Sequence, residues 1–313
     1  MQRLKSIEIC AGAGGQALGL EESGFDHIVL VEIEPLACET LRYNRPQWNV
    51  VQRDLRKFNA SKYKGQIDLL AGGVPCPPFS IAGKQLGQLD ARDLFPEAIR
   101  LVRECDPKAV LLENVRGLLE PKFAEYRKNI ISEIENLGYK VDWKLLNASD
   151  YGVSQLRPRA LLVAIKKEYF HRFRWPEKHK DTPVSIGNLL FEEMVQCGWN
   201  QATEWKTKAN KIAPTLVGGS KKHGGADLGP TRARQAWKEL GIDGKSLANM
   251  PPDQDFIGNP RLTLQMAALV QGFPKTWHFV GKKTPAYKQV GNAFPPPVAQ
   301  AVGKSIYKAI NHE

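Results

Sequence analysis

Apolar residues along the first half of the chain occur in short runs that alternate with helix-like segments. The runs, each of strand length, lie at residues 4–10, 27–34, 49–55, 67–73, 109–115 and 159–165. Helical spacing marks residues 16–25, 35–44 and 94–105 between them, and a longer helix is expected to end near residue 139. Apolar strands bounded by helices indicate a parallel sheet covered on both faces. The pattern therefore predicts a doubly wound α/β domain.

After about residue 190 this alternation disappears. The stretch "GGSKKHGGADLGP" is glycine-rich, basic and without periodicity, which predicts long shaped loops instead of a second sheet. One amphipathic helix is expected over residues 231–240. The last segment predicts a helix that begins with proline and places an apolar residue at every fourth position from Val298 to Ile310. Because such a stripe needs a core, we expect this helix to pack on the α/β domain.

The chain of 313 residues carries a formal net charge of +11, with a pI of about 9.4. This excess of positive charge favours a polyanionic partner such as nucleic acid. Residues 191–284 contain 13 Lys and Arg against 8 Asp and Glu, so positive charge is concentrated there. A module that faces nucleic acid is therefore expected in this segment.

The five cysteines are scattered and include no Cys-x-x-Cys pair. This spacing argues against a disulfide framework and against a zinc site, and we expect no metal. No apolar run reaches the roughly 18 residues of a membrane span, and the first residues, "MQRLKSIEICAGAGG", lack the apolar core of a signal peptide. We therefore expect a cytoplasmic protein with no membrane partner and with thiols available as nucleophiles.

The glycine-rich stretch "AGAGG", Ala11 to Gly15, stands between the first predicted strand and helix. Such a turn lets the backbone pass close to a nucleotide-like ligand, although a nicotinamide cofactor would use a similar one. Glu32 ends the second strand, where a carboxylate can bind a ribose diol, and Asp54 follows the third, within reach of an adenine amino group. Either carboxylate alone is equally well a solvated strand end. Together, the three features favour a nucleoside pocket.

A cysteine stands between prolines in "GGVPCPPFS", directly after the fourth predicted strand. Pro75 and Pro77 restrict the backbone around Cys76. Because ligands bind outside the carboxyl ends of parallel strands, Cys76 and Glu113, at the end of the fifth strand, should face one crevice. A thiol beside a carboxyl suits addition to an electron-poor ring while a ring nitrogen is protonated. On this stretch alone, a proline-rich turn with a buried cysteine is an equally good interpretation.

The stretch "QLRPR" precedes the last predicted strand and offers Arg157 and Arg159, which would favour a thiolate or hold an anion if they point inward, and otherwise form a surface pair. With these motifs, the chain resembles the cytosine-C5 DNA methyltransferases of bacterial restriction–modification systems. The resemblance covers nearly the whole length, in family order. It rests on "AGAGG", the "PC" of "GGVPCPPFS", "ENV", "QLRPR", "RLT…GFP" and "QVGNA".

The resemblance implies a Rossmann-like domain that uses S-adenosylmethionine, formed by residues 1–190 and completed by 285–313. A smaller, loop-rich target-recognition domain would span residues 191–284. The catalytic residues of the family would be Cys76, Glu113, Arg157 and Arg159. The cofactor contacts would be Cys10, Ala11, Gly12, Ala13, Gly14, Gly15, Glu32, Ile33, Asp54, Leu55, Gly73, Pro75, Leu94, Asn292 and Ala293. The DNA contacts would be Ser80, Gln85, Arg92, Thr215, Leu216, Lys221, Lys222, His223, Arg232 and Arg234.

The family mechanism implies that Cys76 attacks C6 of a cytosine flipped out of the duplex. Glu113 would bind and protonate N3, and Arg157 and Arg159 would steady Glu113, the base and the thiolate. C5 then takes the methyl group, which leaves S-adenosylhomocysteine, a base removes the C5 proton, and Cys76 departs. The loop from Ser80 to Arg92 would close over the DNA.

Three places depart from the usual family pattern. Cys10 stands where a phenylalanine often stacks on adenine, and Pro77 replaces a Gln or Asn. Residues 264–266 are Leu-Gln-Met where Pro-Arg-Glu is usual, which puts some bonds between the two domains in doubt but not the chemistry.

We therefore expect a site-specific DNA (cytosine-5-)-methyltransferase of a restriction–modification system, a monomer associated with the nucleoid, whose substrate is double-stranded DNA. A restriction endonuclease would be a functional partner, not a bound one. A tRNA cytosine-C5 methyltransferase is the alternative, but its Cys-Phe-Thr signature is absent, since Gly198 and Trp199 follow Cys197. A DNA-binding module without chemistry would not need all four catalytic residues, and a nicotinamide oxidoreductase would not need the Pro-Cys loop.

Overall fold

The computed structural model describes residues 3–75, 93–218 and 225–311 of the chain. The candidate residues that lie outside these ranges are Cys76, Ser80, Gln85, Arg92, Lys221, Lys222 and His223, together with Pro77.

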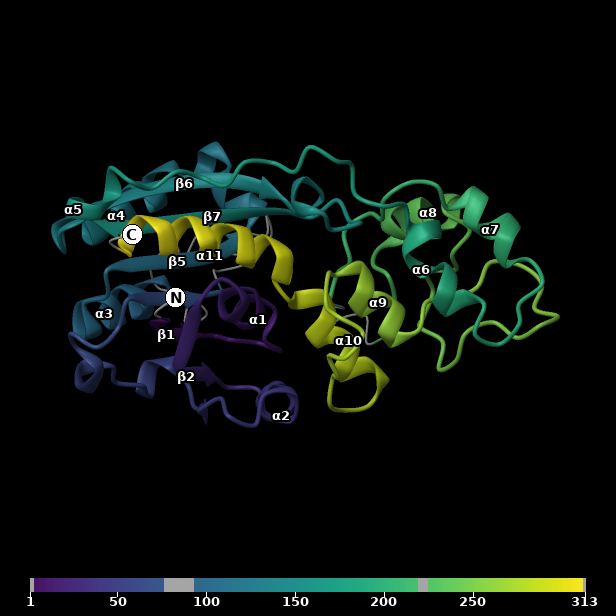
Figure 1. Ribbon diagram of the computed structural model, residues 1–313, viewed down its shortest axis with the longest axis horizontal. Helices are drawn as coiled ribbons and strands as arrows, with labels where there is room; N and C mark the ends of the chain where they lie inside the picture. Colours follow the sequence, from purple (N-terminus) through teal and green to yellow (C-terminus); the bar gives the residue numbers. More distant parts are fainter. Residues whose placement is uncertain (1–2, 76–92, 219–224, 312–313) are drawn as a thin grey trace.

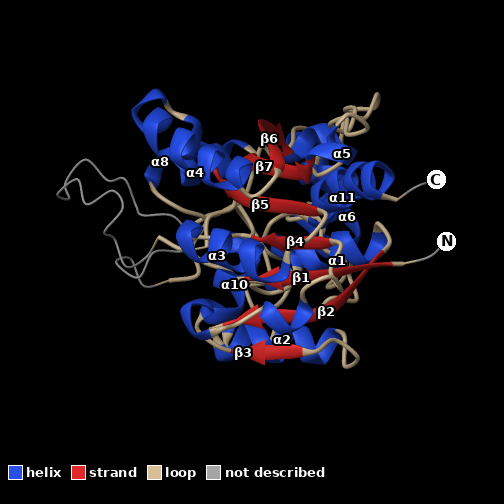
Figure 2. Cartoon of the chain, turned by 90° about the vertical axis from the view of Figure 1, so that its left-hand side faces the viewer, coloured by secondary structure: helices blue, strands red, loops and turns tan. Residues whose placement is uncertain are grey.

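In the described part of the chain, seven strands form one sheet in the order β3-β2-β1-β4-β5-β7-β6 (Figure 2). They are β1 (Leu4–Ile9), β2 (Phe25–Glu32), β3 (Val50–Gln52), β4 (Leu69–Gly72), β5 (Ala109–Val115), β6 (Tyr139–Asn147) and β7 (Pro158–Lys166). The first five strands, β1 to β5, pair with one another in parallel. The predicted doubly wound α/β fold is confirmed. β2 and β3 follow on one side of β1, and the later strands lie on its other side, so the order of the strands reverses next to β1.

One edge of the sheet differs from the prediction of a wholly parallel sheet. β7 runs antiparallel to both β5 and β6, and β6 was not among the predicted strands. Most β6 side chains are half-buried or exposed, including Lys140 and Lys144, so no continuous apolar run marks this strand. The connection at residues 148–157 is too short for the crossover that a parallel pair requires, so β7 returns antiparallel.

Helices cover both faces of the sheet. The helices beside it are α1 (Gly15–Glu22), α2 (Pro35–Asn44), α3 (Phe95–Cys105), α4 (Ala124–Asn136), α5 (Lys167–Phe170) and α11 (Pro296–Ile310). Each face of the sheet has its own hydrophobic core, and alternate residues of β4 point into one or the other. Leu70 packs with α3 and α4, whereas Leu69 and Ala71 pack with α11. None of the helices within the described ranges has the length and apolar composition needed to span a bilayer.

The C-terminal helix α11 returns to the sheet, as its apolar stripe predicts. Val298, Val302, Ile306 and Ile310 are at most 2% exposed. The contact with α1 is close because Gly19 has no side chain, and a Cβ there would lie 2.3 Å from the Pro296 carbonyl oxygen. Packing of α11 against α1 fixes the position of the chain just before α11. That chain, at Asn292 and Ala293, reaches the carboxyl end of the sheet.

The remaining helices form a smaller lobe, residues 186–282, beside the sheet (Figure 1). They are α6 (Ile186–Met194), α7 (Ala202–Lys208), α8 (Thr231–Glu239) and α9 (Leu264–Val270), with α10 (Lys283–Asn292) next in the chain. One hydrophobic cluster runs from Trp237 of the lobe through Trp277 to Leu41 of α2. The expected domain boundaries at residues 190 and 284 fall inside α6 and α10, and this apolar cluster is continuous from the lobe to α2.

The unusual segment Leu264–Met266 begins a capped helix. The Thr263 hydroxyl accepts a hydrogen bond from the Met266 N–H at 3.2 Å, and the Thr263 N–H lies 3.4 Å from the Met266 sulfur. Methionine thus takes the third position of a capping box, where Glu or Gln is preferred. α9 (Leu264–Val270) therefore has a capped N-terminus although its first residues depart from the usual family pattern.

Candidate functional site

The carboxyl ends of β1 and β4 mark the point where the sheet winds in opposite directions. Ligands of open α/β sheets bind in the crevice at such a point. The chain leaves β1 through residues 10–14 and leaves β4 through Gly73–Pro75. Three hollows meet there, which we call the outer cleft, the inner cavity and the lobe-facing pocket.

The outer cleft has a volume of about 550 Å³ and lies above β1, β2 and β3. Ten of the expected cofactor residues line it: Cys10, Gly12, Glu32, Ile33, Asp54, Leu55, Gly73, Pro75, Leu94 and Asn292. Sequence analysis missed Arg53, Lys288 and Gln289 of the same cleft. Arg53 adjoins an expected residue, and Gln289 is the first residue of the "QVGNA" motif, whereas Lys288 carries no local motif that would mark it.

The inner cavity, of about 150 Å³, lies behind the glycine turn. It is lined by four further expected cofactor residues, Ala11, Ala13, Gly15 and Ala293. Gly14 lines neither hollow: its φ is 88°, and a Cβ there would lie 2.7 Å from Leu41 Cδ2. Gly14 therefore shapes the turn, because the left-handed backbone and the close packing exclude a side chain.

Glu32 anchors the turn around the two hollows. One carboxylate oxygen accepts the Gly12 N–H at 2.7 Å, and the other accepts the N–H groups of Ile33 and Glu34, both at 2.8 Å. The neighbouring Cys10 has a left-handed φ of 49°. Burial raises the pKa of the Cys10 thiol, and the Glu32 charge raises it further. The Cys10 thiol therefore stays protonated, and Cys10 forms part of the cleft wall and does not act as a nucleophile.

Asp54 lies at the far end of the outer cleft beside a basic side chain. Its Oδ2 pairs with the Arg56 guanidinium at 2.8 Å, and its Oδ1 accepts the Arg56 N–H at 3.0 Å. The hydrogen bonds from Arg56 hold the pKa of Asp54 below its usual range. The carboxylate therefore stays ionised, as an acceptor for an amino group must.

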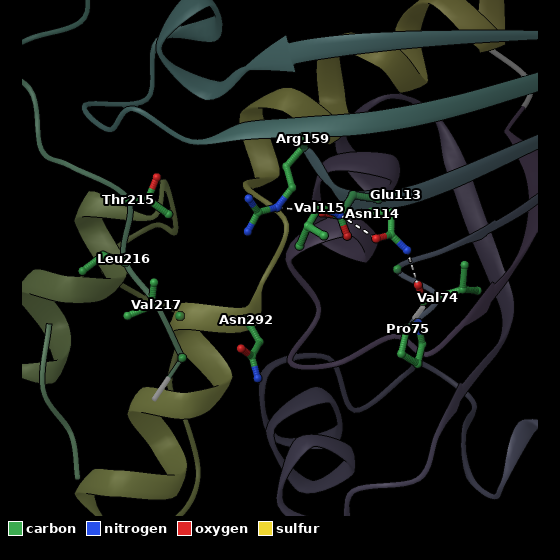
Figure 3. A pocket seen from close by; sticks show the side chains of 13 residues that line it. Val74, Pro75, Glu113, Asn114, Val115, Arg159, Thr215, Leu216, Val217 and Asn292 are labelled. Atoms are coloured by element: carbon green, nitrogen blue, oxygen red, sulfur yellow. Dashed lines mark hydrogen bonds and ion pairs between the residues drawn. The ribbon is translucent and has the colours of Figure 1, made fainter. Parts of the chain in front are cut away.

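The lobe-facing pocket, of about 480 Å³, lies between the sheet and the smaller lobe (Figure 3). Its walls are Gly73–Pro75, Glu113–Val115, Arg159, Thr215–Gly218, Gly291 and Asn292. Gly73 and Asn292 line all three hollows, so a ligand in the outer cleft and one in this pocket would meet beside them.

Glu113 and Arg159 form a buried pair at the wall of the lobe-facing pocket. Arg159 Nε lies 2.7 Å from Glu113 Oε1, and each side chain is 12% exposed. Burial raises the pKa of Glu113, although the two nearby arginines oppose that shift. The Asn114 side-chain amide donates to the Val74 carbonyl at 2.8 Å and holds the β4 loop beside this pair. The pocket thus presents a carboxyl group that keeps its proton to a higher pH than an exposed glutamate does.

Arg157 is held by hydrogen bonds to the backbone, and its charge also lowers the pKa of Glu113. It is fully buried, and its guanidinium donates to the carbonyls of Leu216 at 2.7 Å, Gly291 at 2.7 Å and Ala293 at 3.0 Å. The strand alternation that directs Arg159 to Glu113 does not extend to Arg157, which precedes β7. Arg157 therefore joins the smaller lobe to the end of α10 and the chain that follows it.

Two glutamines that sequence analysis missed complete this junction. Gln155 accepts the Leu216 N–H at 2.8 Å and donates to Gln271 at 2.9 Å. Gln271 in turn donates to the Ala293 carbonyl. Gln155 is the first residue of the "QLRPR" motif, whereas no local motif marks Gln271. The neighbouring Thr215 hydroxyl donates to the Leu156 carbonyl.

The structure does not bring Arg232 and Arg234 to the lobe-facing pocket. Both lie on α8, and Arg234 lines a separate hollow of about 500 Å³ with Lys238 and Lys245. In the part of the chain that the structure describes, no group of three or more His, Cys, Asp and Glu side chains could hold a metal ion.

Comparison with known proteins matches residues 4–308 to the family described as C-5 cytosine-specific DNA methylase. The chain is 56% identical to the type II methyltransferase M.NgoMIV of Neisseria gonorrhoeae, with 98% of each chain covered. It is 52% identical to the type II methyltransferase M.NaeI of Lentzea aerocolonigenes, with 100% of this chain and 77% of that protein covered. The solved structure of the Entamoeba histolytica methyltransferase EhMeth has a TM-score of 0.69 at 15% identity, covers both chains completely and shows a shared fold.

Proposed function

This chain belongs to the C-5 cytosine-specific DNA methylase family, and we propose that it methylates C5 of one cytosine within a specific sequence of double-stranded DNA. It is a DNA cytosine-C5 methyltransferase, and its similarity to type II methyltransferases supports a role as the modification enzyme of a restriction–modification system. The observation that carries the proposal is the buried Glu113–Arg159 pair, which faces a pocket that meets the outer cleft at Gly73 and Asn292.

The outer cleft and the inner cavity fit S-adenosylmethionine. Asp54 and Glu32 stand at the strand ends where a nucleoside would place its amino and hydroxyl groups. The inner cavity contains buried polar atoms of Glu8 and Gln16 without a partner in the described residues, as expected of a cavity shaped for a polar ligand. When bound, the cofactor supplies an electrophilic methyl group.

We assign nucleophilic attack to Cys76, which follows Pro75 in the sequence and lies outside the described residues. Pro75 itself lines both the lobe-facing pocket and the outer cleft. The thiolate adds to C6 of the flipped cytosine, and the electron pair displaced from the C5–C6 double bond makes C5 nucleophilic. After C5 has gained the methyl group, a base removes the C5 proton and Cys76 leaves by β-elimination.

Glu113 supports this addition from the sheet side of the lobe-facing pocket. Its protonated form can donate to N3 of the cytosine, which withdraws electrons from C6 as the thiolate attacks. Arg159 orients the Glu113 carboxyl through the contact of 2.7 Å. Burial keeps the pKa of Glu113 raised, so the acid form persists at pH values where an exposed glutamate is ionised.

Sequence recognition is assigned to residues 191–284, where Thr215 and Leu216 line the pocket and Arg232 lies exposed on α8. Lys221, Lys222 and His223 would contact DNA from the segment outside the described residues, as would Ser80, Gln85 and Arg92. Phosphate contacts would position the duplex, and loop side chains would read bases. In this proposal the enzyme is a cytoplasmic, nucleoid-associated monomer. A restriction endonuclease would recognise the same DNA sequence without binding to the enzyme.

The test is to incubate the protein with labelled S-adenosylmethionine and either DNA or tRNA, and to map 5-methylcytosine in the DNA by bisulfite sequencing. We expect 5-methylcytosine within one short sequence and no label in tRNA. Label that appears in tRNA alone would support the RNA alternative and contradict the proposal.

A further inference from the structure

The backbone at Pro75, in the wall of the lobe-facing pocket, is held from both sides (Figure 3). The carbonyl before it, that of Val74, accepts the Asn114 side-chain amide at 2.8 Å. The proline ring fixes φ. The Pro75 carbonyl accepts the Leu94 N–H at 3.2 Å, which restrains ψ. Because a peptide bond is planar, that carbonyl also sets the direction in which the chain continues to the next residue.

Leu94 precedes the first turn of α3, and its neighbour Asp93 holds that turn in place. A leucine side chain offers no acceptor for the free N–H groups of a helix start. Asp93 Oδ1 instead accepts the Phe95 N–H at 3.0 Å. Asp93 is 9% exposed and Phe95 is 1% exposed, so this hydrogen bond lies away from water and is costly to lose. The Asp93 carboxyl group thus orients the Leu94 N–H that meets Pro75.

Tyr126, in the first turn of α4, binds the other oxygen of Asp93. Its hydroxyl donates to Asp93 Oδ2 at 2.6 Å, and its ring packs edge-on against Phe95, with the ring centroids 6.1 Å apart. The next residue, Arg127, donates to two carbonyls of the segment that follows β5, at 2.6 Å and 2.9 Å. Tyr126 therefore connects Asp93 to the strand that carries Glu113.

We propose that Asp93 and Tyr126 are positioning residues for the nucleophilic attack. Their hydrogen bond holds the start of α3, and through it Pro75, at a fixed place relative to Glu113. This inference rests on the proposed function, because it takes Cys76, the next residue in the sequence, as the nucleophile. Asp93 and Tyr126 line neither the lobe-facing pocket nor the outer cleft, so they act through Pro75. Misplacing a reacting group by about 1 Å can cost roughly a hundredfold in rate, so this hydrogen bond can control turnover.

The test is Tyr126→Phe, which removes the hydroxyl and keeps the ring that packs on Phe95. Single-turnover methylation of DNA that carries the site mapped by bisulfite sequencing should slow by about tenfold. Covalent trapping on 5-fluorocytosine DNA should slow by the same factor, because trapping requires the attack on C6. The affinities for S-adenosylhomocysteine and for DNA should stay within about twofold, since the loss concerns the reaction and not binding. The retained affinities also show that the variant is folded.

Asp93→Ala removes the acceptor of this hydrogen bond together with the cap of α3. It should slow methylation more than Tyr126→Phe does. When Tyr126→Phe is added to Asp93→Ala, the rate should fall by no more than about a further twofold, since the hydroxyl has already lost the carboxylate. Effects that multiply in the double variant would show that the two residues act separately and would contradict the inference.

Tyr139→Phe is the matched control. Tyr139 also donates a hydroxyl hydrogen bond of 2.6 Å, to the Pro107 carbonyl, but at the opposite end of β5 from Glu113. Both substitutions should lower the melting temperature, whereas only Tyr126→Phe should slow methylation. If the two variants methylate DNA at the same rate, or if Tyr126→Phe weakens S-adenosylhomocysteine binding as much as it slows methylation, the inference is wrong while the proposed function stands. If the wild type methylates no DNA, the proposed function itself fails.

Discussion

The carboxyl edge of the sheet and the smaller lobe build their parts of the site in different ways. At the sheet edge, strand register places the loops: Ile9 pairs with Gly72, and Gly72 pairs with Leu112, so the chain leaves three strands side by side. In the lobe, the segment at residues 215–218 is held by two hydrogen bonds at Leu216, whose N–H donates to Gln155 and whose carbonyl accepts from Arg157. Glu113 and Arg159 thus stand on regular strands, whereas the lobe wall depends on individual side chains.

Two arginines of one motif illustrate the difference. Arg159 lies within β7 and pairs with Glu113 in the neighbouring strand, at the wall of the lobe-facing pocket. Arg157, two residues earlier, serves the junction with the lobe. Substitutions on the two sides should therefore separate turnover from domain placement and DNA affinity.

The largest effect is expected from Cys76→Ser. An alcohol has a far higher pKa than a thiol and forms almost no anion at neutral pH, so methyl transfer should fall by roughly 10³-fold or more. DNA affinity in a gel-shift assay should stay close to that of the wild type. Turnover near the wild-type rate would show that Cys76 is not the nucleophile and is a structural turn residue.

Glu113→Gln should lower the turnover rate by about 10²-fold or more, because glutamine cannot transfer a proton to N3. The wild-type rate should fall as pH rises through the raised pKa of Glu113, since the acid form is then lost. The variant should lack this alkaline decline. A pH–rate profile of the same shape in both proteins would exclude Glu113 as the acid.

Arg157→Met should lower the free energy of unfolding by roughly 3 kcal/mol, because buried carbonyl acceptors lose their donor. Thermal or urea unfolding measures the loss. The control is Arg103→Met on the exposed surface of α3, expected to change stability by no more than about 0.5 kcal/mol. Equal effects of the two substitutions would contradict a stabilising role of Arg157 at the junction between the smaller lobe and α10.

Arg232→Ala should have the smallest effect, a few-fold loss of DNA affinity with cofactor affinity unchanged. On a log–log plot of affinity against salt, the slope should decrease in magnitude by about 0.9 if one phosphate contact is lost. Lys140→Ala, on the far edge of the sheet, should leave the slope as it is. If Arg232→Ala abolished cofactor binding, the assignment of residues 191–284 to DNA would be wrong.

The sequence predicted the sheet side well because its signals are local. Apolar strands, the glycine turn and the carboxylates at strand ends place Glu32, Asp54 and Glu113 at one edge without any knowledge of distant contacts. β6 escaped prediction because its half-exposed side chains lack an apolar run. β7, which lies between β5 and the edge strand β6, then had no signal for its antiparallel direction.

The unforeseen parts of the site depend on contacts between residues far apart in the chain. Arg157 meets Gly291 and Ala293 across more than a hundred positions. Gln271 has no local feature that reveals its link to Ala293. Glu8 looks like any polar residue of a strand until the fold buries it beside a cavity.

The covalent route through Cys76 is tested most directly with DNA that carries 5-fluorocytosine at the target position. Fluorine cannot leave C5 as a cation, so β-elimination should fail after methyl transfer. We predict a complex of protein and DNA that survives denaturant, forms only with S-adenosylmethionine present and is absent from Cys76→Ser. Methylation of ordinary DNA without any trapped complex on the fluorinated DNA, or trapping by Cys76→Ser, would contradict the account.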